Sequence, residues 1–124
     1  MIKLAIIDDE TASISVLQEG LSRGKNFHIT TFTNPIMALS AIRPGSVDVI
    51  LCDIVMPQMD GVELLEKLKE KDPAVVVIMM TGQSTLDRVL KSHKTGANDY
   101  ILKPFSNMSD IEKKIIDLYN KKIR

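Results

Sequence analysis

Five short apolar runs alternate along the chain with segments whose apolar residues have helical spacing. The first, third and fourth runs are almost continuously apolar, which is typical of strands buried on both faces of a parallel sheet, whereas the second contains polar residues and is expected at a sheet edge. The alternation predicts one α/β domain over residues 1–124, an open doubly wound parallel sheet with helices on both faces. The expected strands are Ile2–Ile7, Phe27–Phe32, Val47–Cys52, Val75–Met80 and Tyr100–Leu102.

The segments between these strands carry helix signals. Asn34-Pro35 and Asp60-Gly61 each predict a helix start, and Ser84 with Asp87 resembles a capping pair for a helix that ends near Gly96. The first and last helices are indicated by apolar stripes at Ile14, Leu17 and Leu21, and at Ile111, Ile115, Leu118 and Tyr119.

Charge and composition exclude several classes of protein. Sixteen Lys and Arg balance sixteen Asp and Glu, so the chain lacks the basic excess of a domain that binds nucleic acid through its phosphates. The longest apolar run, Ala74–Met80, is too short to span a membrane, and Ile2–Ile7 is too short for a signal peptide. Cys52 is the single cysteine and is expected to be a small buried hydrophobe. A cytoplasmic location is therefore expected.

Charged and hydroxyl side chains follow the predicted strands. Right-handed crossovers place the carboxyl ends of parallel strands along one edge of the sheet, where ligands of such folds bind. At these ends the chain carries Asp8-Asp9-Glu10, Asp53, Thr81-Gly82 and Lys103-Pro104. Three or four carboxylates and one ammonium group are therefore expected on one rim.

A cluster of acids at this rim requires a positive partner. Two unit charges about 4 Å apart repel by roughly 4 kcal/mol at an effective dielectric near 20. Carboxylate oxygens suit a hard cation such as Mg²⁺. We interpret Asp8, Asp9 and Asp53 as candidate metal ligands, and Glu10 as an acid that caps the first helix and favours its dipole.

Asp53, Lys103 and Thr81 have ordinary interpretations when each is taken alone: a loop acid, a solvated lysine and a turn cap. Beside a cation and a lysine, however, Asp53 becomes a candidate nucleophile toward a phosphoryl group, because carboxylates form aspartyl phosphates. Lys103 is then expected to pair with Asp53 or with phosphoryl oxygens, and the Thr81 hydroxyl to donate to one of those oxygens. Neither a P-loop nor a Gly-x-Gly-x-x-Gly motif after the first strand is present.

Four segments in order now indicate a family. They are Ile6-Ile-Asp-Asp-Glu10, Asp53-Ile-Val-Met-Pro-Gln-Met-Asp-Gly61, Thr81-Gly82 and Gly96-Ala-Asn-Asp-Tyr-Ile-Leu-Lys-Pro-Phe105. Each segment lies at a predicted strand end. The whole chain resembles the receiver domain of two-component response regulators and is similar to the chemotaxis regulator.

The resemblance implies a flavodoxin-like three-layer sandwich with strand order 2-1-3-4-5, an order for which a receiver protein is itself a standard example. It also implies that Asp53 is the phosphoacceptor. Asp9, Asp53 and the backbone carbonyl of Val55 would ligate Mg²⁺, or Mn²⁺ in its place, with Asp8 acting through water. Thr81 and Lys103 would contact the phosphoryl group, and the Lys103-Pro104 bond is a candidate cis peptide.

The resemblance further implies a switch. Phosphorylation would draw the Thr81 hydroxyl inward and let Tyr100 turn, which would reshape the face formed by helix four, strand five and helix five. The ordinary interpretation of Tyr100 is a half-buried strand residue. The implied phosphoryl donor is a histidine kinase or phosphotransfer protein. The chain would catalyse only its own phosphorylation and dephosphorylation, so it is not expected to be a turnover enzyme.

An output domain or an effector protein is the partner that is expected to respond to this face. Direct binding to nucleic acid or a membrane is not expected, and a homodimer, if one forms, is expected to use the same switch face. Val89 and Ser92 stand on helix four where many relatives carry alanines, a departure that bears on how this helix packs. Val55 and Gln83 occupy positions where family members tune the lifetime of the phosphoryl group.

Two other classes compete with this interpretation. A phosphatase of the haloacid dehalogenase type would carry Asp-x-Asp at the end of strand one, whereas Asp8 and Asp9 are adjacent, and the chain has no room for a cap domain. A flavodoxin-like flavin binder would carry a Ser/Thr-rich phosphate loop where this chain has acids.

Overall fold

In the computed structural model, which describes residues 1–82 and 86–123, five parallel strands form one sheet. The order is β2-β1-β3-β4-β5, so the polar second strand does lie at an edge and the continuously apolar strands lie in the interior. The predicted order and fold class are confirmed. The strands are β1 (Ile2–Ile7), β2 (Phe27–Phe32), β3 (Val49–Asp53), β4 (Val76–Thr81) and β5 (Asp99–Leu102).

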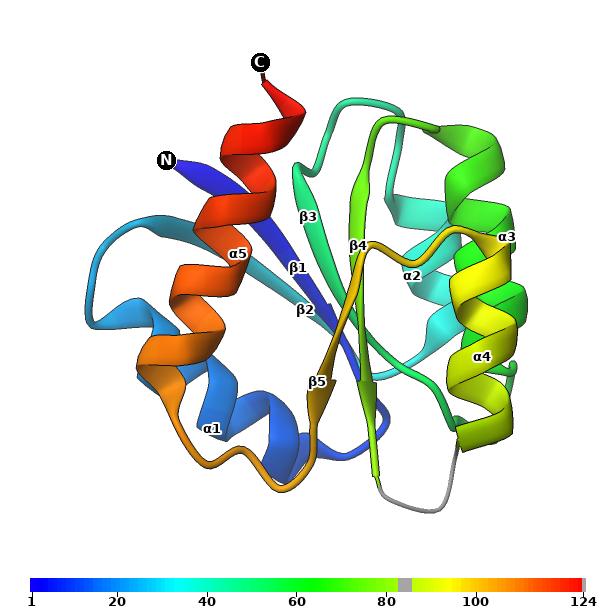
Figure 1. The fold of residues 1–124 in the computed structure, drawn as a ribbon, viewed down its shortest axis with the longest axis horizontal. Helices are drawn as coiled ribbons and strands as arrows, with labels where there is room; N and C mark the ends of the chain where they lie inside the picture. The colour runs from blue at the N-terminus through cyan, green and yellow to red at the C-terminus, as the bar shows by residue number, and fades with distance from the viewer. Residues whose placement is uncertain (83–85, 124) are drawn as a thin grey trace.

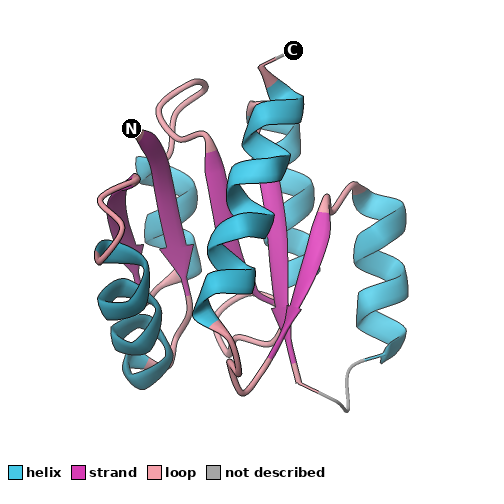
Figure 2. Ribbon diagram, turned by 60° about the vertical axis from the view of Figure 1, so that its left-hand side comes forward, coloured by secondary structure: helices cyan, strands magenta, loops and turns pink. Residues whose placement is uncertain are grey.

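Helices cover both faces of the sheet, as Figures 1 and 2 show. One face carries α1 and α5, and the other carries α2, α3 and α4. The bounds are α1 (Thr11–Ser22), α2 (Pro35–Ala41), α3 (Gly61–Lys71), α4 (Leu86–Thr95) and α5 (Met108–Lys122). Within the described residues, no helix combines the length and apolar character that crossing a bilayer requires.

Side-chain caps fix the helix starts. Asn34 Oδ1 accepts hydrogen bonds from the backbone N–H groups of the second and third helical residues, and Pro35 fills the first helical position. Asp60 Oδ1 accepts from Val62 N at 2.8 Å, so α3 begins where the sequence predicts. Ser84 of the expected capping pair for α4 lies outside the described residues, and so does the side chain of Asp87.

Each face of the sheet has its own apolar core, because successive residues of a strand point to opposite faces. On the α1/α5 face, Leu17, Leu21 and Ile115 have no exposed surface; on the other face, the same holds for Leu64 and Leu65. All five residues of β3 and all six of β4 are buried. The two cores hold the central strands rigidly, and the strand ends therefore occupy fixed positions.

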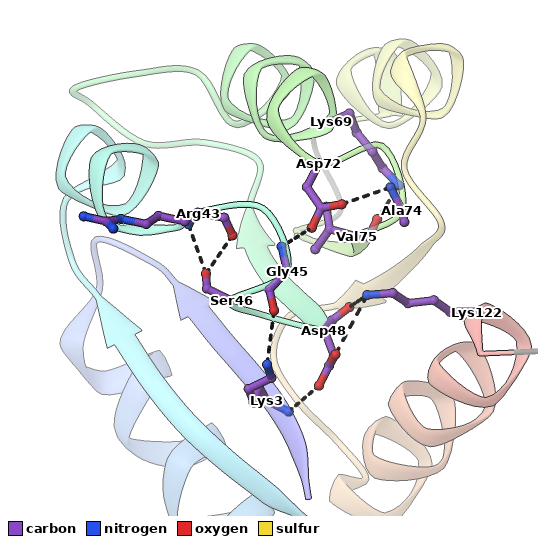
Figure 3. A network of polar contacts seen from close by, with 10 residues as sticks. All are labelled: Lys3, Arg43, Gly45, Ser46, Asp48, Lys69, Asp72, Ala74, Val75 and Lys122. Carbon is purple, nitrogen blue, oxygen red and sulfur yellow. Dashed lines mark hydrogen bonds and ion pairs between the residues drawn. The ribbon is translucent and has the colours of Figure 1, made fainter.

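A polar network closes the amino ends of the strands, opposite the acid-rich edge (Figure 3). Asp48 Oδ2 accepts the backbone N–H of Lys3 at 2.8 Å, and the Lys122 amine at the end of α5 donates to the Asp48 carbonyl at 3.3 Å. Lys3 Nζ donates in turn to the Gly45 carbonyl at 3.1 Å. These contacts hold together β1, the residues that precede β3 and the end of α5.

Candidate functional site at the carboxyl ends of the strands

Strand register brings the predicted site residues together. Ile7 pairs with Cys52 in the sheet, so the next residues along the chain, Asp8 and Asp53, lie side by side at the ends of β1 and β3. On the other side of β3, Asp53 pairs with Met80, the residue before Thr81. The backbone N–H of Lys103 donates to the Thr81 carbonyl at 2.8 Å, which extends the β4–β5 ladder to the rim.

Lys103 is the charge at the centre of this rim. Its Nζ lies 2.7 Å from Asp8 Oδ2, 3.3 Å from Glu10 Oε1 and 3.5 Å from Asp53 Oδ2. The Lys103 side chain is 16% exposed, so these ion pairs are shielded from water far more than surface pairs are. One ammonium group thus faces three carboxylates, and the predicted cluster of acids and one lysine is present.

The carboxylates fit a hard metal ion. Asp8, Glu10 and Asp53 each place one oxygen within 4.8 Å of the others. Asp8 is fully buried, and its Oδ2 lies close to the Lys103 ammonium. Within the described part of the chain, however, this oxygen accepts no well-directed hydrogen bond. A buried carboxylate oxygen with spare acceptor capacity, beside two more carboxylates, is what Mg²⁺ would use.

Glu10 and Asp9 differ from the sequence interpretation. Glu10 stands at the N-cap position of α1 but makes no side-chain cap, because its carboxylate is drawn to Lys103; instead Asp8 Oδ1 accepts the Glu10 backbone N–H at 2.9 Å. The prediction of a side-chain cap by Glu10 is therefore wrong, although Glu10 does stand at the start of α1 as predicted. The partly exposed Asp9 carboxylate lies outside the 4.8 Å group, so Asp9 as a direct ligand stays a prediction.

Asp53 is difficult to ionise in this setting. Burial raises its pKa, and the charges of Asp8 and Asp9 raise it further, while Lys103 and a backbone hydrogen bond from Val55 act in the opposite direction. The net pKa of Asp53 rises from 3.8 to about 7. A cation placed among these acids would favour the charged, nucleophilic carboxylate.

Lys103 keeps its proton. Burial lowers the pKa of Lys103, but the close contact of its ammonium with the Asp8 carboxylate and the charges of Asp53 and Asp8 outweigh burial, so the net pKa is raised. The ammonium form is therefore available to contact an anionic group. Its peptide bond to Pro104 is cis.

Gly61 lets the loop after β3 fold tightly against Asp53. Its backbone N–H donates to the Ile54 carbonyl at 2.8 Å, and a Cβ at this position would overlap the Asp53 carbonyl oxygen and lie 2.7 Å from Ile54 Cα. A residue without a side chain is thus required where α3 begins. The glycine of the Asp53–Gly61 segment has a role in packing beside the phosphoacceptor candidate.

The remaining predicted residues lie around this centre. Thr81 is buried at the rim and its hydroxyl donates to the Gly82 carbonyl at 2.9 Å. The Val55 side chain is 49% exposed, and its carbonyl as a metal ligand stays a prediction. Tyr100 of β5 is half-buried, and its hydroxyl donates to the Val89 carbonyl of α4. Gln83 lies outside the described residues.

Sequence reasoning missed two contacts. One is the approach of Glu10 to Lys103, for which the signal was available, since glutamate is a poor N-cap compared with Ser, Thr, Asp or Asn. The other is a hydroxyl contact between Ser92 and Tyr100. The sequence marks Ser92 as a departure from the family pattern, but only the packing of α4 on β5 shows what its hydroxyl contacts.

A five-stranded parallel sheet of this order is the flavodoxin-like fold of the chemotaxis-type regulators. The acidic rim with its central lysine lies where such folds bind ligands. The family model for the response regulator receiver domain matches residues 4–116, and the chain belongs to this family. It is therefore a receiver domain of two-component signalling.

Relatives and solved structures agree with this assignment. The chain is 40% identical to the DNA-binding transcriptional regulator NtrC of Escherichia coli K12 over 100 residues (81% of this chain, 21% of that protein), and 35% identical to the transcriptional regulatory protein ZraR of Klebsiella oxytoca over 103 residues (83% and 23%). A receiver domain from Methanospirillum hungatei matches with a TM-score of 0.90 at 29% identity, covering 99% of this chain and 97% of that one. The chain thus spans about a quarter of the length of these curated relatives.

Proposed function

We propose that this chain accepts a phosphoryl group on Asp53 in a Mg²⁺-dependent reaction and passes the signal on through a change of shape. The observation that carries the proposal is the position of the buried Asp53 carboxylate, 3.5 Å from the Lys103 ammonium and within one cluster with Asp8 and Glu10. An acid buried at a strand end beside a cation has a nucleophile's surroundings.

The proposed reaction transfers a phosphoryl group from an oxygen or nitrogen atom of the donor to a carboxylate oxygen of Asp53. An Asp53 carboxylate oxygen forms the new bond to phosphorus, the bond between phosphorus and the donor breaks, and the donor leaves with the electron pair of that bond. Lys103 holds one oxygen of the transferred group by charge and hydrogen bonding, and Thr81 supplies a hydroxyl donor. Positioning and electrostatics would account for the catalysis.

Mg²⁺, or Mn²⁺ in its place, would be held by Asp53 with Asp8 and Asp9, directly or through water, and by the Val55 carbonyl. When bound, the ion offsets the negative charge of the carboxylates and the phosphoryl oxygens. Glu10, which contacts Lys103 from the exposed side, is well placed to compete with the phosphoryl group for that lysine. The chain would act only on itself and would not turn over a separate substrate.

The proposed donor is a histidine kinase or a histidine phosphotransfer protein. A groove of mainly apolar character borders the site between α1 and the segment after β5; it is lined by Glu10, Ala12, Ser13, Val16, Lys103, Pro104 and Phe105. Val16 in this groove is 50% exposed, which suits contact with an apolar partner surface next to Asp53. A donor that draws its phosphoryl group from ATP would place the reaction in the cytoplasm.

The proposed readout is the face formed by α4, β5 and α5, with Thr81 and Tyr100 as the residues that change. Leu90 and Leu102 on this face are 57% and 65% exposed, an apolar surface suited to an output domain, an effector protein or a second copy. NtrC and ZraR are transcriptional regulators by name. For this domain, no direct contact with nucleic acid or a membrane is proposed.

Intact-protein mass spectrometry tests the proposal. The protein is incubated with a small phosphodonor with and without Mg²⁺, beside Asp53→Asn and beside Asp117→Asn, in which an exposed α5 carboxylate is changed. The expected result is one added phosphoryl group on the wild type and on Asp117→Asn, present only with Mg²⁺, and none on Asp53→Asn. Equal labelling of Asp53→Asn, or labelling without a divalent cation, would contradict it.

A further inference from the structure

The Tyr100 hydroxyl belongs to a small hydrogen-bonded cluster on α4. It donates to the Val89 carbonyl at 3.1 Å, and the Ser92 hydroxyl lies 2.8 Å from the same carbonyl and 3.3 Å from the tyrosine oxygen. Ser92 has no exposed surface, although it is a polar residue on the buried side of its helix. A buried hydroxyl is tolerated where it has partners, so Ser92 is held in this orientation by the contacts it makes.

The main chain of Tyr100 is fixed from the opposite side. Its carbonyl accepts a hydrogen bond from Lys114 Nζ of α5 at 2.8 Å, and the same amine lies 3.5 Å from Asp99 Oδ1. Tyr100 therefore binds α4 with its side chain and α5 with its backbone. A change in the orientation of the tyrosine ring would break the contact with α4, while the backbone of Tyr100 stays bonded to α5.

Tyr100 is also close to the site in the sheet. It pairs with Met79 of β4, and because side chains alternate along a strand, Met79, Thr81 and Tyr100 project to the same face. The Tyr100 ring packs against the core cluster that contains Met79, as does Val89 of α4. A movement of β4 at Thr81 would therefore change the surface against which the Tyr100 ring packs.

The conformation described here suits an unmodified site. The Thr81 hydroxyl donates to the Gly82 carbonyl at 2.9 Å, and the Lys103 amine is closer to Asp8 than to Asp53. To bind a phosphoryl group on Asp53, the Thr81 donor has to leave that carbonyl and Lys103 has to turn from Asp8. The phosphorylated conformation therefore differs from this one at Thr81 and at Lys103.

We propose that Ser92 is a positioning residue that holds Tyr100 against α4, and that this contact raises the threshold for the phosphorylated conformation. The inference rests on the proposed function of Asp53. A ligand shifts an equilibrium only by its differential affinity for the two conformations, so a contact made only in the resting one weakens apparent binding of a phosphoryl mimic. One modest hydrogen bond corresponds to roughly a two- to fivefold effect.

The test is the affinity of the protein for fluoroberyllate, a phosphoryl mimic, in the presence of Mg²⁺, measured by NMR titration. Ser92→Ala is expected to bind roughly two- to fivefold more tightly, and Tyr100→Phe, which keeps the ring and loses the hydroxyl, is expected to shift in the same direction. The double variant is expected to gain less than the product of the two single effects, because they remove a shared contact. Thr95→Val is the matched control, since Thr95 bonds the Lys91 carbonyl at 2.9 Å on the same helix without contacting Tyr100.

Unchanged or weaker binding by Ser92→Ala, or fully multiplicative effects, would overturn the proposal. Failure of the wild type to bind fluoroberyllate would instead refute the proposed function, and with it the threshold. Hydrogen exchange of α4 amides without ligand then tests the holding contact alone. Faster exchange in Ser92→Ala and Tyr100→Phe, but not in Thr95→Val, would support it, and equal protection in all four proteins would overturn it.

Discussion

Replacing Asp53 by Asn should stabilise the metal-free protein at neutral and alkaline pH. The folded chain raises the pKa of Asp53 from 3.8 to about 7, chiefly because the carboxyl is buried and secondly because Asp8 is charged. The folded state therefore holds on to a proton that the unfolded state releases. Stability contributed by the neutral acid is complete below pH 3.8 and is lost as the pH rises through about 7.

The magnitude follows from the size of the pKa difference. At about 1.4 kcal/mol per pKa unit, the difference between the pKa of Asp53 in the unfolded and the folded state corresponds to roughly 4 kcal/mol of stability. Because water can enter the rim and screen the charges, we expect a gain of about 2 to 4 kcal/mol. Asn carries no charge at any pH, so Asp53→Asn avoids the penalty. Its loss of the Lys103 contact is small, because that lysine retains Asp8 and Glu10.

The assay is urea unfolding of both proteins between pH 4 and pH 8, without divalent cations. The free energy of unfolding should be nearly equal at pH 4 and should favour Asp53→Asn by about 2 to 4 kcal/mol at pH 8. Adding Mg²⁺ should narrow the gap, since the wild type offers one more carboxylate. Asp117→Asn, with an exposed acid, should follow the wild type throughout. A variant no more stable than the wild type at pH 8, or equally favoured at pH 4, would refute the reasoning.

Three further outcomes follow from the same site. Gly61→Ala should lower the free energy of unfolding by about 2 to 3 kcal/mol, because its methyl group meets backbone atoms beside Asp53. Gly20→Ala is the control in the same urea titration and should cost less, since the three atoms nearest to its methyl belong to the Met108 side chain, which can shift. Lys103→Met should cost about 3 kcal/mol without Mg²⁺, since three carboxylates lose their cation, whereas Lys114→Met, which breaks a half-exposed pair, should cost under about 1 kcal/mol; equal costs would contradict the central role of Lys103. Cys52 should react with a thiol reagent only after unfolding, because burial and then the Asp53 charge raise its thiol pKa; a fast reaction of the folded protein would contradict this placement.

Much of the fold followed from the sequence because apolar periodicity reports burial directly. The starts of α2 and α3 were predictable from Asn34 and Asp60, whose side chains cap those helices in the structure. Strand limits were predicted less well: β3 begins at Val49 rather than Val47, although the backbone of Asp48 still bonds to Lys3 of β1 and accepts from Lys122 of α5.

The site was predictable to the level of which residues share an edge. Parallel strands and right-handed crossovers require Asp8, Asp53, Thr81 and Lys103 to lie at one rim, whatever their side chains then do. The pairing among them was not predictable, because it depends on distances of a few ångströms between side chains from separate loops. The preference of Lys103 for Asp8, and the contact of Tyr100 with Ser92, are results of tertiary packing.

The measurement that tests the account most directly is the location of the phosphoryl group. After labelling by a small phosphodonor with Mg²⁺, borohydride reduction converts an aspartyl phosphate to homoserine, and peptide mass mapping then identifies the residue. The account predicts homoserine at position 53 and nowhere else along the chain. A label that maps to Asp8 or Asp9, or one on a residue that borohydride does not reduce, would contradict the central role of Asp53.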